Sequence, residues 1–340
     1  MSDTLHCRDK VLERDVVIKA LKPGIAPQKL LDELTALAAI RSRFVVEILD
    51  VIRDGSGAVV AVIEEFLAGA PLQPCSSGYT AADALKSLFQ VAAGIADIHA
   101  HGRIHRDLKP ENMKFDAEGQ LNIFDFGLAK LDGSPGTAQL FFSPGYTAPE
   151  AFQVTSAGLH TFTPAVDVYA FGCVACWLLN GGVLPTELAQ VPPSLPVPGF
   201  SFCKIAGVLP FAITSLLDRC IDQASSARPE MRVVRDALAA ELLRDKHRLL
   251  LTYGNNAQFV DAANRSVTLT AGGASVAIDY NGLEFTVSAV SGSVLINNTP
   301  VTVGMPLLGS SVIVLGVKNP SAGLYATSVT ADVSHPEVTI

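Results

Sequence analysis

HRDLKPEN, residues 105–112, places three chemically different side chains within six positions. Asp107 is a carboxylate that can accept or orient a hydroxyl proton, and Lys109 is a cation that can offset charge on a phosphoryl group. Asn112 offers an oxygen suited to a hard metal ion such as Mg²⁺, and Asp125, on a predicted turn, offers a second. These groups suit phosphoryl transfer, in which a protein mainly positions reactants and neutralises charge.

Two further motifs follow in order, namely DFG at 125–127 and APE at 148–150. Together with HRDLKPEN they resemble the eukaryotic-like (Hanks-type) Ser/Thr protein kinases, over about residues 4–245. The resemblance implies an α+β, bilobal protein-kinase fold at 1–251, with a truncated N-lobe at about 1–68 and a C-lobe at about 69–251. A C-terminal all-β sandwich domain is expected to follow.

The resemblance implies ATP as the phosphoryl donor and Mg²⁺, or Mn²⁺ in its place, as the metal. Asp107, Lys109 and Asn112 would be the catalytic residues, and Asn112 and Asp125 the metal ligands. Lys109 in this position implies Ser/Thr substrates in proteins. Ser143, in the SPGY turn, would form hydrogen bonds near Asp107 and Lys109.

The strand ending in Val-Val-Ile-Lys at 16–19 matches the VAIK strand of kinases, so Lys19 would bind the α- and β-phosphates of ATP. Glu33, on a helix predicted at 27–40, is its candidate partner, and a solvent-facing role for this residue is the alternative. Val17 and the segment with Glu65 and Leu67 would line the adenine site, the latter two through backbone groups.

Two features depart from the kinase pattern. The glycine-rich loop should precede Lys19, but the chain has no room for it. Either the true start lies upstream, or nucleotide binds without this loop, in which case weak ATP binding or low activity is expected. Glu64 and Lys114 stand at positions beside the adenine site that are normally apolar. Either they pair with each other, since an unpaired buried charge is costly, or both side chains reach water.

Residues 125–150 form the predicted activation segment. Arg106 would pair with a phosphate there, for which Ser134 and Thr137 are candidate sites. The resemblance also implies that Glu150 pairs with Arg228.

The kinase resemblance further implies that Asp167 caps the backbone of the catalytic loop. His99 and His101 are expected in packing or surface roles. Periodicity predicts a hairpin at 4–21, strands at 45–53 and 58–67, a helix at 80–101, a hairpin at 115–124, a loop at 185–198, and helices that run to about residue 251.

The composition narrows the functional classes. A net charge of −8 without a basic cluster argues against nucleic acid and anionic membranes as partners. No apolar run is long enough to span a membrane, and the N-terminus does not resemble a signal peptide. The six cysteines lack paired metal-ligand spacing, so reduced thiols and a cytoplasmic location are expected.

From residue 252 to 340 the composition changes to Val, Thr, Ser, Gly and Asn with few charges. Short strands are predicted at 266–270, 275–280, 284–289, 293–296 and 311–315. The end of this module faintly resembles a forkhead-associated (FHA) domain, although phosphate-reading motifs are absent; another β-sandwich is the alternative. Docking or self-association is its expected role, because scarce charge predicts a covered surface.

Three functions remain open at this point. The first is a Ser/Thr protein kinase, with autophosphorylation. The second is a pseudokinase scaffold that binds partners through the kinase fold and the β-module. The third is a kinase-fold phosphotransferase for small molecules, which the APE segment and its docking turn disfavour.

Overall fold

The computed structural model describes residues 2–21, 38, 40–76, 79–317, 326–334 and 336–338. Its contacts divide the chain into two compact units, Met1–Leu238 and Ala239–Thr339. The sequence places this boundary between 251 and 252 instead. The prediction that helices run to about residue 251 is wrong, because strand β9 (Leu249–Tyr253) buries Leu249 and Leu251 in the core of the second unit.

The first unit begins with a four-stranded antiparallel sheet in the order β1-β2-β4-β3. Its strands are β1 (Ser2–Asp9), β2 (Arg14–Leu21), β3 (Ile48–Arg53) and β4 (Val59–Glu65). β-Branched residues dominate β2 and β4 and suit a pleated, half-buried surface. The predicted hairpin and both predicted strands are confirmed to within a few residues.

Two predictions for this region stay open. The helix predicted at 27–40, which carries Glu33, lies outside the described residues apart from Ala38 and Ile40. The lack of a glycine-rich loop before Lys19 also stays a prediction.

The described helices are α2 (Ala81–Ala100), α3 (Ala165–Leu179), α4 (Thr186–Ala189), α5 (Phe202–Ile205), α6 (Phe211–Cys220) and α7 (Met231–Leu242), of which α7 starts in the first unit and ends past its boundary. Thr80 and Asp83 start α2 with a reciprocal capping box, which satisfies main-chain donors at the helix end. The helix predicted at 80–101 is therefore confirmed. The loop predicted at 185–198 is wrong in part, because α4 forms one helical turn within it.

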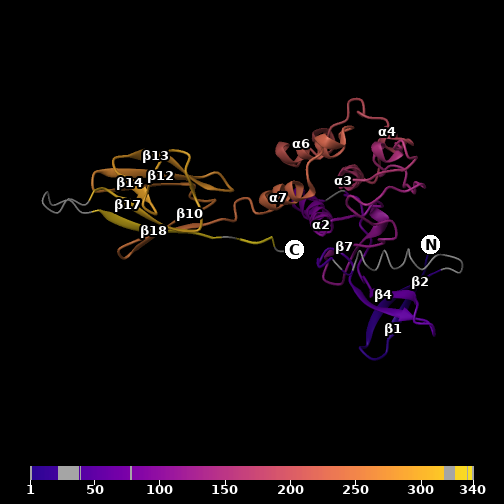
Figure 1. Ribbon diagram of the computed structural model, residues 1–340. Helices are drawn as coiled ribbons and strands as arrows, with labels where there is room; N and C mark the ends of the chain where they lie inside the picture. Colours follow the sequence, from indigo (N-terminus) through magenta and orange to yellow (C-terminus); the bar gives the residue numbers. More distant parts are fainter. Residues whose placement is uncertain are drawn as a thin grey trace. The chain divides into compact units, whose positions relative to one another are not determined.

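Short strands join the sheet to the helices. β5 (Arg103–Ile104) pairs with β8 (Lys130–Leu131), and β6 (Met113–Phe115) pairs with β7 (Leu121–Ile123), which confirms the predicted hairpin. The main-chain N–H of Val46 donates to the carbonyl of Ile123 at 3.0 Å. In Figure 1, β7 lies between the four-stranded sheet and α2. This bond joins β7 to the segment that leads into β3 of the sheet.

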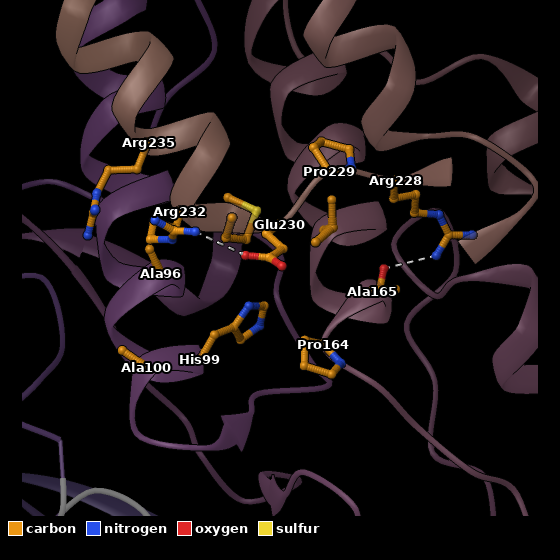
Figure 2. Close-up of a pocket in the computed structure, with 12 residues that line it drawn as sticks. Ala96, His99, Ala100, Pro164, Ala165, Arg228, Pro229, Glu230, Arg232 and Arg235 are labelled. Carbon is orange, nitrogen blue, oxygen red and sulfur yellow. Dashed lines mark hydrogen bonds and ion pairs between the residues drawn. The ribbon is translucent and has the colours of Figure 1, made fainter. Parts of the chain in front are cut away.

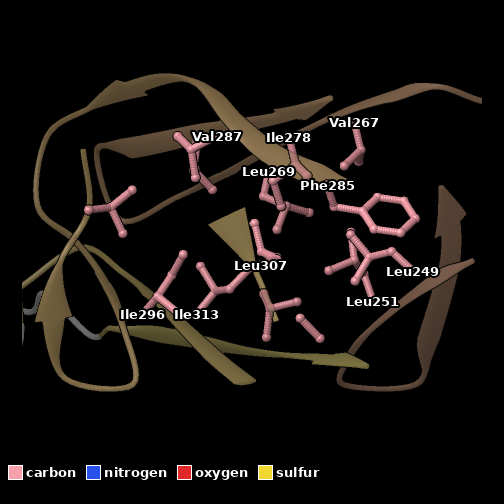
Figure 3. Packing of buried hydrophobic residues seen from close by; sticks show 14 of the residues in the cluster. Leu249, Leu251, Val267, Leu269, Ile278, Phe285, Val287, Ile296, Leu307 and Ile313 are labelled. Carbon is pink, nitrogen blue, oxygen red and sulfur yellow. The ribbon is translucent and has the colours of Figure 1, made fainter. Parts of the chain in front are cut away.

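The second unit contains two antiparallel sheets that share one apolar core (Figure 3). One sheet has the order β10-β9-β18-β17-β14-β15 and the other β11-β12-β13-β16. Besides β9, the strands are β10 (Asn256–Val260), β11 (Ser266–Ala271), β12 (Ala274–Tyr280), β13 (Phe285–Ser291), β14 (Val294–Ile296), β15 (Thr299–Pro300), β16 (Pro306–Leu307), β17 (Ser310–Leu315) and β18 (Thr327–Val333). Alternate residues such as Val276, Ile278 and Tyr280 are buried in this core, as the period of a strand requires. All five predicted strands are confirmed to within two residues.

Within the part of the chain that the structure describes, no helix is long and apolar enough to cross a bilayer. None of the six cysteines forms a disulfide in the structure, and their reduced state stays a prediction. Cys173 and Cys176 are fully buried in α3 and act there as core residues.

Candidate active site

Asp107 is the centre of a cluster of polar side chains. Its carboxylate accepts hydrogen bonds from Lys109 Nζ at 2.8 and 3.0 Å and from Ser143 Oγ at 2.6 Å. Lys109 Nζ also donates to Ser143 Oγ at 3.0 Å. Asn112 Nδ2 donates to the main-chain oxygen of Asp107 at 2.8 Å and to its Oδ2 at 3.2 Å. The structure thus brings together the three predicted catalytic residues and confirms the expected contacts of Ser143.

The main chain brings Asn112 next to the segment that precedes Asp125. Pro110–Asn112 forms a 3-10 turn, and Phe124 N donates to the main-chain oxygen of Asn112 at 3.0 Å, one residue before Asp125. The Asp125 side chain is exposed, whereas the Asn112 amide nitrogen is engaged by Asp107, which leaves the amide oxygen for a ligand. One carboxylate and one amide oxygen match the donors that Mg²⁺ or Mn²⁺ takes alongside water and phosphate oxygens, so these residues fit such an ion.

Asp167 in α3 holds the main chain of the catalytic loop. Its fully buried carboxylate accepts hydrogen bonds from His105 N at 2.8 Å, Arg106 N at 2.9 Å and His99 Nε2 at 3.0 Å. Burial alone would raise the pKa of Asp167, but the hydrogen bond from His99, the neighbouring imidazoles and the main-chain donors outweigh it and lower this pKa. The predicted capping role is confirmed. The partnership with His99 was not predicted from the sequence, since only the fold brings α2 to α3.

His105 is fully buried beside the same loop. Its Nε2 lies 3.2 Å from the carbonyl oxygen of Phe124, and its Nδ1 accepts a hydrogen bond from Asp107 N at 3.3 Å. The imidazole packs on Phe126 with 4.5 Å between ring centres. Burial lowers the pKa of His105, which agrees with a neutral ring that donates through one nitrogen and accepts through the other.

Lys19 and Glu64 form a buried ion pair. Lys19 Nζ lies 3.2 Å from Glu64 Oε1, and the residues are 7% and 3% exposed. Lys114 lies instead with Nζ 5.1 Å from the ring centre of Phe66. The predicted pairing of Glu64 with Lys114 is therefore wrong, and so is the alternative that Glu64 reaches water, because strand register directs Glu64 to Lys19. The predicted pairing of Lys19 with Glu33 falls on residues outside the described ranges.

The segment after β4 contains the residues predicted to line the adenine site. Glu65 N donates to the main-chain oxygen of Glu47 at 3.0 Å, so this N–H is already used. Leu67 is buried, and no hydrogen bond joins its main chain to another residue within the described ranges. The N–H and C=O of Leu67 are therefore the groups available to a ligand here. Val17 is half-buried on β2, directly opposite Glu64.

The activation segment contains the candidate phosphosites. Arg106 Nη1 donates to the main-chain oxygen of Leu128 at 3.2 Å, and its guanidinium lies 3.7 Å from the ring centre of Phe162. Burial lowers the pKa of Arg106 to about 10. The Thr137 hydroxyl is buried and forms no hydrogen bond with any described residue, while Ser134 is partly exposed. Ser134 is thus the more accessible of the two candidates.

Glu150 and Arg228 pair as predicted. Arg228 donates to the Glu150 carboxylate through Nη1 at 2.6 Å and Nη2 at 2.9 Å, in the two-pronged geometry that favours Arg. Its Nη1 also donates to the main-chain oxygen of Ala165 at the start of α3. This pair ties the end of the activation segment to the helical core.

A separate cavity of about 380 Å³ lies between α2 and the starts of α3 and α7 (Figure 2). It is lined by Ala96, His99, Ala100, Pro164, Ala165, Val168, Arg228, Pro229, Glu230, Met231, Arg232 and Arg235. Its wall includes His99, the partner of Asp167, but none of the predicted catalytic or nucleotide-binding residues. This cavity is therefore not the predicted nucleotide site.

A carboxylate, a cation, a hydroxyl and an amide thus lie within hydrogen-bond distance of one another on a mixed sheet and helix fold. A family model for the protein kinase domain matches residues 1–235, so the chain belongs to the protein kinase family.

Curated relatives agree with this assignment. The chain is 35% identical over 186 residues to cyclin-dependent kinase 20 of Rattus norvegicus, covering 50% of this chain and 49% of that protein. It is 30% identical over 220 residues to Serine/threonine-protein kinases drp72 of Corynebacterium efficiens, covering 58% and 41%. It is 33% identical over 169 residues to calcium/calmodulin-dependent protein kinase type 1 of Caenorhabditis elegans, covering 48% and 46%. The match thus spans about half the length of these relatives or less.

Proposed function

We propose that this chain is a Ser/Thr protein kinase that transfers the γ-phosphoryl group of ATP to protein hydroxyls, including its own. The observation that carries the proposal is the cluster of Asp107, Lys109 and Ser143, with distances of 2.6–3.0 Å among their polar atoms. The carboxylate is held ready to accept a proton, and a cation lies beside it where phosphoryl charge would develop.

The chemical step follows from these positions. The substrate hydroxyl oxygen forms a bond to the γ-phosphorus while the bond to the β,γ-bridging oxygen breaks, and ADP leaves with the electron pair. Asp107 orients the hydroxyl and takes its proton. Lys109 stabilises charge on the phosphoryl oxygens in flight. Ser143, which is hydrogen-bonded to both side chains, holds them in fixed positions relative to each other.

Nucleotide and metal would occupy the space between the four-stranded sheet and the helical part of the first unit. Lys19 would bind the α- and β-phosphates, and the main chain of Leu67 would bind the adenine edge. Asn112 and Asp125 would hold Mg²⁺ or Mn²⁺, which neutralises phosphate charge when bound.

The test is incubation of the purified chain with Mg²⁺ and γ-labelled ATP, alone and with a generic basic protein. Asp107→Asn should abolish the transfer of label. Asp236→Asn is the matched control, since this carboxylate is 57% exposed and pairs only with the neighbouring Arg235 among described residues. Label that persists in Asp107→Asn would contradict the assigned role. An unlabelled wild type at millimolar ATP would favour a scaffold.

For the second unit we propose a β-sandwich, FHA-like or of another type, that docks a partner or a second copy of the chain. The support is its scarce charge together with exposed apolar residues, among them Leu308 at 75% and Val303 at 63%. Sedimentation equilibrium of the full chain and of Leu308→Asp tests self-association. A monomer at all concentrations would leave a different protein as the partner.

A further inference from the structure

We propose that Glu64 is a positioning residue for phosphoryl transfer, because it fixes the ammonium group of Lys19 from within the sheet. The inference rests on the proposed kinase function and deepens it. It assigns to the sheet itself a task that the sequence analysis gave only to the helix carrying Glu33.

The strand register places these two side chains together. In the pairing of β2 with β4, Val17 stands opposite Glu64, and Lys19 stands opposite Val62. Residues opposite each other share a face, as do residues two apart on one strand. Lys19 and Glu64 are therefore diagonal neighbours on one face, within reach for long side chains, and the 3.2 Å separation of their charged atoms follows.

Both side chains of the pair are almost completely buried. Only 8% of the Lys19 side chain and 4% of the Glu64 side chain are exposed. A charge in such surroundings needs a partner, since water cannot solvate it there. Glu64 thus supplies a countercharge to the Lys19 ammonium and restricts its position before a nucleotide arrives.

The pair also differs from an ion pair between separate elements. Both partners belong to hydrogen-bonded neighbouring strands, so their backbone separation is fixed by the sheet. The strand register therefore sets the geometry of this contact within the sheet. We therefore expect Lys19 to keep its place in the absence of nucleotide.

The test uses four forms of the full chain: wild type, Glu64→Gln, Lys19→Met and the double variant. Glu64→Gln keeps the shape and removes the charge, and kcat/KM should fall about 10- to 100-fold, as when a reacting group is slightly misplaced. Glu64→Asp, which restores the charge on a shorter side chain, should recover part of the loss. In the Lys19→Met background, Glu64→Gln should cause no further loss of Mg²⁺·ATP affinity, measured with a fluorescent nucleotide.

Glu47→Gln is the control, because this exposed carboxylate lies close to the same sheet and outside the proposed machinery. Thermal unfolding separates function from folding, and the neutral double variant should be more stable than Glu64→Gln alone. An equal loss from Glu64→Gln with and without Lys19, or no loss at all, would overturn the inference.

A wild type that binds Mg²⁺·ATP without transferring phosphate would refute the kinase proposal. The nucleotide affinities of the four forms would then still show whether Glu64 acts through Lys19. A wild type that binds no nucleotide would overturn both.

Discussion

Substitution of Asp167 by Asn tests what holds the catalytic loop in place. The carboxylate is fully buried and accepts three hydrogen bonds of 2.8–3.0 Å, two of them from the main chain of the loop. Asn keeps the size but offers one acceptor oxygen, and its amide group would face N–H donors. The substitution therefore removes a buried charge and leaves donors of the loop unsatisfied.

The magnitude follows from these contacts. A hydrogen bond to a charged group contributes about 1.5–3 kcal/mol, and removal of one member of a buried charged pair costs about 3–5 kcal/mol. We expect Asp167→Asn to lower the free energy of unfolding of the first unit by about 3–5 kcal/mol. His99→Leu, which removes one donor of the three, should cost about 1–2 kcal/mol.

Urea unfolding followed by tryptophan fluorescence measures this loss. The chain has one tryptophan, Trp177, on α3 with Asp167, so the signal reports the first unit. The lowered pKa of Asp167 means that its stabilisation is complete above the ordinary value of 3.8 and is lost as the pH falls through the folded pKa. In Asp167→Asn, the free energy of unfolding should therefore depend less on pH below about pH 4 than in the wild type.

The control is Asp236→Asn on the exposed face of α7, which should change stability by no more than about 0.5 kcal/mol. If Asp167→Asn cost no more than this control, the loop would not depend on the carboxylate. A folded Asp167→Asn protein should also lose about 100-fold in kcat, because the loop carries Asp107.

Three further predictions concern the first unit. Glu150→Gln leaves the fully buried Arg228 side chain without its carboxylate, so urea unfolding should show a loss of about 3–5 kcal/mol, and a loss under 1 kcal/mol would contradict this. The lowered pKa of His105 means that protons bind the unfolded chain more readily, so stability should fall by up to about 1.4 kcal/mol per pH unit below pH 6.5, and His105→Gln should remove that slope. Gly69→Ala places Cβ 2.5 Å from a main-chain oxygen and should cost about 1–3 kcal/mol, whereas Gly55→Ala, with nothing within 4 Å, should be nearly neutral; equal effects would contradict the predicted clash.

Much of the fold could be predicted from the sequence because its local signals are strong. The helix at α2 combines a capping box with apolar residues at helical spacing, and the longer strands of the second unit alternate cleanly. β15 and β16 contain two residues each, which is too short to show a period. β9 escaped prediction because Leu-Leu-Leu-Thr-Tyr is a short apolar run, which periodicity cannot assign to a strand rather than a helix.

Some contacts of the candidate site could also be predicted from the sequence, and others could not. The resemblance to kinase motifs allowed the contacts of Asp107, Lys109 and Ser143 to be predicted. The partner of Glu64 could not be predicted, because it depends on the register between β2 and β4. A shift of one residue would turn Glu64 to the other face of the sheet. The sequence shows two unusual charges, Glu64 and Lys114, and pairing them with each other was the simplest arrangement without that register.

Buried charges connect the site to distant parts of the chain. Only 17% of the residues are charged, yet three buried charged side chains form contacts that hold the candidate site together. Lys19 pairs with β4, Asp167 binds the catalytic loop and Arg228 binds the activation segment. Each has a partner far away in sequence, and each would be costly to bury alone. Loss of one partner should therefore damage stability and geometry together, whereas a neutral double replacement should restore stability without restoring geometry. That separation allows the structural and the functional role of each pair to be measured independently.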